Sequence, residues 1–222
     1  IAGAARTPMG GMQGALSGLT APKLGAAAIK AALERAGVAA DAVDETIMGC
    51  VLPAGLGQAP ARQASVGAGI PVATGCTTVN KMCGSDMKAV MLGNDAIRAG
   101  SADIVVAGGM ESMTNSPYIL PKVRDGMRLG HGEMLDHMFY DGLEDAFDKG
   151  RLMGTFAEDC ANKYAFSRET QDAYAIESPT RARKAIEDGD CRRETTAVDV
   201  PSRHRSATAE NQEHPGQPKT DR

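Results

Sequence analysis

The feature that most constrains the fold of this chain is an alternation of helical patterns and short apolar segments. In chain order, the segments are residues 20–37, 46–52, 55–71, 84–99 and 103–109. The first and fourth have helical periodicity, the third is a loop that leads into a short helix, and the other two are strand-like. Strands that alternate with helices are typical of βαβ units. We therefore predict an α/β fold with a βαβαβ-type arrangement and a mostly parallel sheet over residues 1–116.

The ends of the two longer helices carry recognisable signals. Thr20 is a predicted cap, Pro22 fits the first helical turn, and Gly37 can end the first helix. Gly100 can end the second helix. Apolar side chains of this second helix are predicted to share one face, and they are Met87, Val90, Met91 and Ile97. The segment 103–109 is apolar throughout, so we predict a fully buried strand, as in parallel sheets.

The pattern changes after residue 116. Residues 117–151 are rich in Met, Gly, Asp and His and show no sustained periodicity. Two helices are predicted beyond them, one from Thr155, which has capping-box spacing with Glu158, and one from near Ser167. Pro179 falls inside the second helical pattern, where a proline costs about 3 kcal/mol or kinks the helix, so we predict a break there.

The chain thus divides into three predicted parts. Residues 1–116 form the α/β domain, and residues 117–200 form a second domain. Residues 201–222 are almost without apolar side chains and cannot offset the entropy of ordering, so we predict a disordered polar tail.

Charge and composition exclude several classes of protein. The chain carries 24 basic and 28 acidic side chains, for a formal net charge of −4, whereas a nucleic-acid surface needs basic clusters. No apolar run approaches the roughly 18 residues that span a bilayer, and no signal-peptide pattern is present. We therefore expect no nucleic-acid partner, no membrane span and a cytoplasmic location.

The 5 cysteines are odd in number and widely spaced, with no C-x-x-C pair. A structural zinc site and a disulfide framework are both disfavoured by this spacing, and we predict no metal. Four of the cysteines are predicted to be reduced, mostly buried and chemically inert; they are Cys50, Cys76, Cys160 and Cys191.

Cys83 differs because it lies in a polar turn, in VNKMCGSDMKAV, just before a predicted helix. The attacking form of cysteine is the thiolate, and a helix N-terminus presents N–H groups and partial positive charge that stabilise it. Gly84 lets a substrate approach the backbone closely. The same amides could stabilise an oxyanion on a substrate carbonyl.

Several long segments together resemble the thiolase family, in particular its acetyl-CoA acetyltransferase (acetoacetyl-CoA thiolase) type. They are GAARTPMG, GQAPARQA, NKMCGS with MKAV, DIVVAGGMESM, and DGLEDAFDKGRLMGTFAED. The resemblance extends in order to about Val200 and covers the N-terminal half of such a protein. It implies a thiolase-like fold, with residues 117–200 as part of the loop domain used for coenzyme A contact and oligomerisation.

The resemblance also implies a chemistry. Thiolases cleave a 3-ketoacyl-CoA with coenzyme A, or condense two acetyl-CoA molecules, through an acetyl thioester on a cysteine that matches Cys83. The main-chain N–H of Cys83 would form part of an oxyanion hole, and Leu143 and Met153 are candidate contacts to the pantetheine arm. Coenzyme A and acetyl-CoA are substrates, no cofactor is permanently bound, the assembly is a homo-oligomer (dimer or tetramer), and the setting is fatty acid metabolism.

The chain departs from the family pattern in two ways. Asp86 stands where the family usually has Gly, and its charge and bulk are expected to impair acylation of Cys83. The family's GHP, CxGGG and NEAF motifs, which supply a catalytic His, Cys and Asn, are absent. We therefore expect a truncated chain that is inactive alone. Neither His131 nor His137 replaces the missing base, because both are predicted to be exposed loop residues, and His204 and His214 fall in the polar tail.

Two alternatives stay open. The chain could be a non-catalytic thiolase remnant or a subunit-interaction module, or it could belong to a related condensing enzyme such as a ketoacyl synthase. NKMCGS and GGMESM favour a thiolase over the last of these. Glu111, within GGMESM, is a candidate general base, but a role in packing and loop support is favoured.

Overall fold

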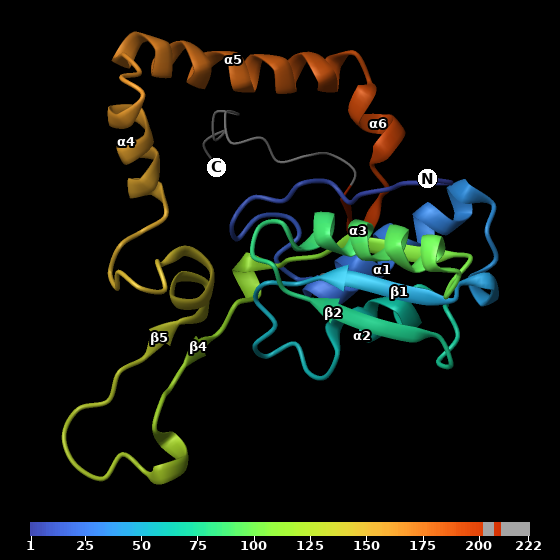
Figure 1. Ribbon diagram of the computed structural model, residues 1–222, viewed down its shortest axis with the longest axis horizontal. Helices are drawn as coiled ribbons and strands as arrows, with labels where there is room; N and C mark the ends of the chain where they lie inside the picture. The colour runs from blue at the N-terminus through green and yellow to red at the C-terminus, as the bar shows by residue number, and fades with distance from the viewer. Residues whose placement is uncertain (202–206, 210–222) are drawn as a thin grey trace.

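The computed structural model describes residues 1–201 and 207–209, and a three-stranded parallel sheet lies at its centre (Figure 1). The strands are β1 (Glu45–Gly49), β2 (Gly75–Val79) and β3 (Val105–Gly109), in the order β2-β1-β3. Both pairings are parallel and in register, with Ile47 of β1 opposite Thr77 and Ala107. The predicted α/β fold with a parallel sheet is confirmed.

Helices cover both faces of the sheet (Figure 1). They are α1 (Ala21–Ala36), α2 (Pro60–Gly67) and α3 (Ser85–Ala99). The connections β1-α2-β2 and β2-α3-β3 cross the sheet in opposite directions, so right-handed crossovers place α2 and α3 on opposite faces. Alternate residues of β1 follow this arrangement, since Thr46 hydrogen-bonds to Ser65 of α2 at 3.0 Å whereas Gly49 lies against the start of α3.

The main core lies between α1, α2 and β1. It includes Ile29 and Leu33 of α1, Met48 of β1, and Ala61 and Ala64 of α2, all buried. The small alanines allow α1 and α2 to approach closely, as the Ala-rich composition indicates. The predicted helix ends are confirmed where glycine supplies them, because Gly37 (φ 64°) and Gly100 (φ 72°) both adopt the left-handed conformation. Thr20 is at the N-cap position but makes no side-chain capping bond.

The prediction of a fully buried strand over residues 103–109 was wrong. Strand β3 is half-buried rather than fully buried, because it lies at one side of the described sheet and β1 takes the central place. The apolar face of α3 is exposed, because the helix packs on the sheet through its small residues Ser85, Ala89 and Gly93 instead. The exposed side chains are Met87, Val90, Met91 and Ile97.

Residues after 116 extend away from the sheet as a hairpin and an arch of helices (Figure 1). The regular elements are β4 (Tyr118–Ile119), β5 (Leu135–Asp136), the π-helix η4 (Met138–Leu143), α4 (Gly154–Lys163), α5 (Arg168–Glu187), α6 (Asp190–Glu194), β6 (Val198–Val200) and β7 (Ala207–Ala209). Short 3₁₀ helices are η1 (Ala40–Ala42), η2 (Met113–Asn115) and η3 (Val123–Asp125). Neither α4 nor α5 contains a buried residue.

Helix α5 corrects the predicted break at Pro179. The helix begins next to Ser167, as predicted, and runs through the proline without interruption. The Ser167 hydroxyl caps it by accepting a hydrogen bond from the Thr170 N–H. Because the helix is exposed, solvent can hydrate the carbonyl that loses its partner to the proline. Ion pairs between Arg181 and Glu177, and between Lys184 and Asp188, add local support on this stretch.

Two further predictions differ from the structure. Helix α4 has Met153 at its N-cap position, and the Thr155 hydroxyl donates to the Leu152 carbonyl at 2.8 Å, so no capping box forms. Within the predicted disordered tail 201–222, residues Ala207–Ala209 form strand β7, antiparallel to β6. His204 and His214 lie outside the described residues.

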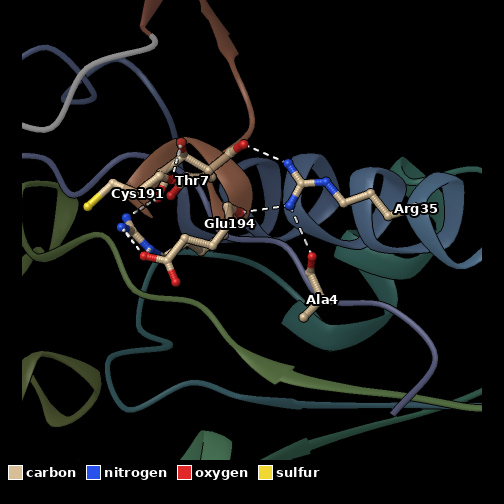
Figure 2. Close-up of polar contacts among 7 residues, drawn as sticks. Ala4, Thr7, Arg35, Cys191 and Glu194 are labelled. Atoms are coloured by element: carbon tan, nitrogen blue, oxygen red, sulfur yellow. Dashed lines mark hydrogen bonds and ion pairs between the residues drawn. The ribbon is translucent and has the colours of Figure 1, made fainter. Parts of the chain in front are cut away.

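The arch returns to the sheet domain at a polar anchor on α1. Figure 2 shows the guanidinium of Arg35 directed at backbone carbonyls from both ends of the described chain. It donates to the Ala4 carbonyl at 3.0 Å and to the carbonyls of Glu194 and Thr195 at 2.9 and 2.6 Å. Arg6 pairs with the Glu194 carboxylate at 2.6 Å. These contacts fix the end of α6 against the first residues of the chain.

Candidate active site

The carboxyl ends of β1, β2 and β3 open into a cavity of about 400 Å³. Its lining comes from the residues at and after the ends of β1 and β3, from the turn that leads into α3, and from the π-helix η4. The crevice at the carboxyl ends of parallel strands is where α/β proteins commonly bind ligands. The volume lies within the range of small-molecule sites.

Cys83 lines this cavity and is exposed. It directly precedes Gly84, the N-cap residue of α3, so the prediction that this thiol lies at a helix start is confirmed. The thiol is not packed into the core, and the helix N-terminus faces the same cavity. The thiol is therefore open to a ligand in the cavity and lies beside the start of a helix.

The turn that carries Cys83 is closed by Ser85. The Ser85 hydroxyl accepts from the Lys81 N–H at 2.9 Å and donates to the Met82 carbonyl, and the Ser85 N–H donates to that carbonyl at 3.0 Å. Ser85 is only 4% exposed, so these bonds are protected from water. Met82 has φ 51°, an uncommon left-handed conformation for a residue other than glycine.

Several amides at this helix start already have partners. The Gly84 N–H donates to the Lys81 carbonyl at 3.2 Å, and the Met87 N–H donates to Asp86 Oδ1 at 2.9 Å. Together with Ser85, these contacts narrow the set of N–H groups that could stabilise a substrate oxyanion. Asp86 is exposed and lines the cavity, and its expected effect on acylation of Cys83 stays a prediction.

Two glycines let α3 approach the strand ends. A Cβ on Gly49 would lie 2.7 Å from the Ser85 Cβ and 2.8 Å from the Asp86 nitrogen. A Cβ on Gly109 would lie 2.7 Å from the Asp86 Cβ. Since real Cβ atoms do not approach this closely, the glycines at the ends of β1 and β3 set how near the helix N-terminus lies to the sheet.

Glu111, just after β3, holds the segment that follows β1. Its carboxylate accepts from the Val51 N–H at 2.8 Å and the Leu52 N–H at 3.0 Å. Both oxygens are thus occupied by backbone donors, which supports the predicted loop-support role over general-base catalysis. The neighbouring Cys50 is buried, and burial, followed by the Glu111 charge, raises the pKa of its thiol to about 12. Cys50 is therefore an inert thiol.

The cavity wall formed by η4 is attached through His137, which was predicted to be exposed and is in fact only 5% exposed. His137 Nδ1 lies 2.5 Å from Asp141 Oδ2, and its Nε2 accepts from the Ala54 N–H at 3.3 Å. This pairing makes Nδ1 the protonated nitrogen. The prediction of an exposed His137 failed because its burial depends on Ala54, which is distant in the sequence, and on the folding of η4. The residues around His137 indicate neither of these. His131 is exposed, as predicted.

The two predicted coenzyme A contacts lie next to each other. Leu143 lines the cavity, and the Met153 N–H donates to the Leu143 carbonyl at 3.0 Å. The Met153 side chain is 51% exposed and is not part of the cavity lining. Leu143 and Cys83 thus line the same cavity. Met153 lies outside the cavity lining and is hydrogen-bonded to Leu143 through the backbone.

The other cysteines differ from the prediction of mostly buried thiols. Only Cys50 is buried, Cys76 and Cys191 are partly exposed, and Cys160 is exposed on α4. Sequence reasoning also missed the cavity-lining methionines, which are Met82, Met110, Met113 and Met138. The sequence could have indicated Met110 and Met113, because they follow the apolar strand that ends at Gly109, and residues after a parallel strand often line a binding site.

The described part of the chain contains no group of three or more His, Cys, Asp or Glu side chains placed to hold a metal ion. Among its helices, none has both the length and the apolar character needed to cross a bilayer.

Comparison with known proteins adds the family. The sequence matches the family model described as thiolase, N-terminal domain, over residues 1–221. The chain belongs to the thiolase family. An acetyl-CoA acetyltransferase of Pseudomonas aeruginosa is 50% identical over 203 residues, which are 91% of this chain and 51% of the relative.

Other thiolase relatives give the same result. Acetyl-CoA acetyltransferase 2 of Arabidopsis thaliana is 53% identical over 201 residues, 90% of this chain and 49% of the relative. A probable acetyl-CoA acetyltransferase of Escherichia coli is 44% identical over 221 residues, 100% of this chain and 55% of the relative. This thiolase chain therefore spans about half the length of the relatives it matches, and the resemblance to the family found in the sequence is confirmed.

Proposed function

We propose that this chain is the acyl-accepting half of an acetyl-CoA C-acetyltransferase, with Cys83 as the nucleophile. The observation that carries the proposal is the exposed thiol of Cys83 at the start of α3, facing a cavity at the carboxyl ends of three parallel strands. The names of the relatives, which are acetyl-CoA acetyltransferases, support the same substrate class.

In the first step, the Cys83 proton is lost and the sulfur attacks the carbonyl carbon of acetyl-CoA. The tetrahedral intermediate collapses with cleavage of the carbon–sulfur bond to coenzyme A, which leaves as a thiolate and takes up a proton. The acetyl group remains on Cys83 as a thioester, so no net oxidation or reduction occurs. The partial positive charge at the start of α3 would stabilise the developing oxyanion.

In the second step, another acetyl-CoA loses an α-proton and its enolate attacks the acetyl thioester. This forms acetoacetyl-CoA and returns Cys83 as a thiolate; the reverse sequence is thiolysis of a 3-ketoacyl-CoA. The proton transfers of this step need a base. Of the two carboxylates in the described cavity lining, Glu111 is held by backbone donors and Asp86 accepts from the Met87 N–H at 2.9 Å, so we assign the base role to neither. We therefore propose that the chain alone accepts an acetyl group but does not turn over.

Coenzyme A would approach across η4 and the start of α4. Leu143 in the cavity lining and the exposed Met153 beside it are the proposed contacts for the apolar part of the pantetheine arm. We also propose a homo-oligomeric assembly, dimer or tetramer, a role in fatty acid metabolism and no permanently bound cofactor, as implied by the family resemblance. A cytoplasmic location is proposed on the composition of the sequence.

Incubation of the 222-residue chain with acetyl-CoA, followed by intact-mass measurement and peptide mapping, tests the proposal. The expected result is addition of one acetyl group at Cys83, absent in Cys83→Ala. Cys160 serves as an internal control, because it is exposed but lies on α4 outside the cavity lining. Absence of the adduct, or equal labelling of Cys160, would refute acyl transfer and favour the alternative of a non-catalytic remnant or subunit-interaction module.

A further inference from the structure

The side chain of Asn80 connects the end of β2 to the segment that follows β1. Its Nδ2 donates to the Val51 carbonyl at 3.4 Å, and its Oδ1 accepts from the Met82 N–H at 2.9 Å. A donor must face the carbonyl and an acceptor must face the N–H, so the two contacts fix the orientation of the amide group.

The Val51 end of this connection is itself anchored. The Val51 and Leu52 N–H groups donate to the Glu111 carboxylate at 2.8 and 3.0 Å. Glu111 follows β3, and the Met110 N–H donates to the Gly49 carbonyl at 3.0 Å, which ties the ends of β3 and β1 together. The carbonyl that Asn80 uses therefore belongs to a segment fixed from two strands.

The Met82 end of the connection carries strain. Met82 has φ 51°, which crowds the Cβ of any residue other than glycine, and it directly precedes Cys83. Such a conformation persists only where its surroundings enforce it. Two sets of hydrogen bonds hold this turn. Asn80 binds the Met82 N–H, and Ser85 binds the Lys81 N–H and the Met82 carbonyl.

We propose that Asn80 is a positioning residue that holds Met82 in its left-handed conformation and thereby directs Cys83 into the cavity, with Glu111 as the anchor of the connection. This inference rests on the proposed function only in that Cys83 is the acyl acceptor. The geometric part is independent of acyl transfer, because it concerns where the thiol is held.

Asn80→Ala in the full chain tests the proposal through alkylation by iodoacetamide. Peptide mapping gives the rate at Cys83 divided by the rate at the exposed Cys160, which corrects for reagent and folding differences. We expect this ratio to fall about fivefold, the effect of losing roughly one neutral hydrogen bond. The matched control is Asn94→Ala, because Asn94 is exposed on α3 and its side chain donates a hydrogen bond to the Asp95 carboxylate, at 3.5 Å, away from the Cys83 turn.

A glycine rescue separates positioning from a general structural role. Glycine adopts positive φ without steric cost, so Asn80→Ala combined with Met82→Gly should restore most of the lost ratio. Met82→Gly alone measures the effect of removing the methionine side chain. The effect of Asn80→Ala on the alkylation ratio is then compared with and without Met82→Gly, as in a double-mutant cycle. Glu111→Gln, which retains one acceptor oxygen, should lower the ratio less than Asn80→Ala and carries the test if Asn80→Ala does not fold.

An unchanged or increased ratio in Asn80→Ala, or a lowered ratio that Met82→Gly does not restore, would overturn the proposal. The result is distinguishable from failure of the proposed function. If acetyl-CoA leaves Cys83 unmodified while the alkylation ratios behave as expected, acyl transfer is refuted and the positioning role of Asn80 stands.

Discussion

Replacement of Gly49 by alanine tests how closely α3 must approach the sheet. The new Cβ would lie 2.7 Å from the Ser85 Cβ and 2.8 Å from the Asp86 nitrogen. Carbon atoms rest about 3.5–4.0 Å apart, so the start of α3 must move by roughly 1 Å. Two of the three nearest atoms are backbone, which means that a change of side-chain rotamer cannot relieve the contact.

Overpacking of this kind costs about 1–3 kcal/mol. Alanine also restricts the unfolded chain, which returns about 0.4–1 kcal/mol, so we expect a net loss of about 1–2 kcal/mol. For a chain of this size, that corresponds to a decrease in melting temperature of about 2–8 °C. Circular dichroism at 222 nm, a helix signal, would follow the thermal transition of the full chain.

Gly108→Ala is the matched control. Gly108 lies in β3 next to Gly109, and a Cβ there would be 3.5 Å from Met48 Sδ and 3.6 Å from Met48 Cε, which are ordinary contacts. We expect its melting temperature to equal or exceed that of the parent chain. If the melting temperature of Gly49→Ala is no lower than that of Gly108→Ala, then α3 leaves room for a side chain at residue 49, and the steric argument is wrong.

Three further changes test separate features. Pro179→Ala should stabilise α5 by about 3 kcal/mol and slow amide hydrogen exchange between residues 176 and 187; unchanged exchange would contradict the account of α5. Asp86→Gly should increase the iodoacetamide rate at Cys83, by less than about fivefold because exposed charges are screened; a rate no faster would remove the electrostatic argument. The pKa of the Cys50 thiol is raised from 9.0 to about 12, so the folded chain binds more protons than the unfolded chain above pH 9, and its free energy of unfolding should fall between pH 9 and 12. Cys50→Ala should reduce this dependence of the free energy of unfolding on pH, measured by denaturant titration. An unaltered dependence would show that other groups cause it.

Local signals predicted much of the fold. Gly37 and Gly100 ended their helices where expected, because a left-handed C-cap depends on the residue itself and needs no distant partner. The position of Cys83 before α3 followed from the same kind of reasoning. The half-buried state of β3 could not be predicted, because it depends on strand order, which a helix-and-strand pattern does not determine.

Side chains with distant partners were harder to predict. His137 is buried because its ring meets the Ala54 N–H, 83 residues away, and no local pattern indicates that contact. Glu111 and Asn80 have the same difficulty, since their partners follow different strands. The Thr155 capping box failed for a local reason, because the helix began one residue earlier and the hydroxyl used the Leu152 carbonyl.

The polar anchor at Arg35 has a consequence for protein engineering. The excursion from residue 117 to Glu194 leaves the sheet domain beside the cavity and rejoins it where Arg35 and Arg6 hold the end of α6. Between these two ends, His137 also attaches the excursion to Ala54, whereas α4 and α5 contain no buried residue, so the excursion behaves as a cassette joined to the sheet domain at three places. Swapping it for the corresponding stretch of another thiolase, with Arg6, Arg35 and Glu194 retained, would alter what surrounds the thiol without redesigning the scaffold that holds it.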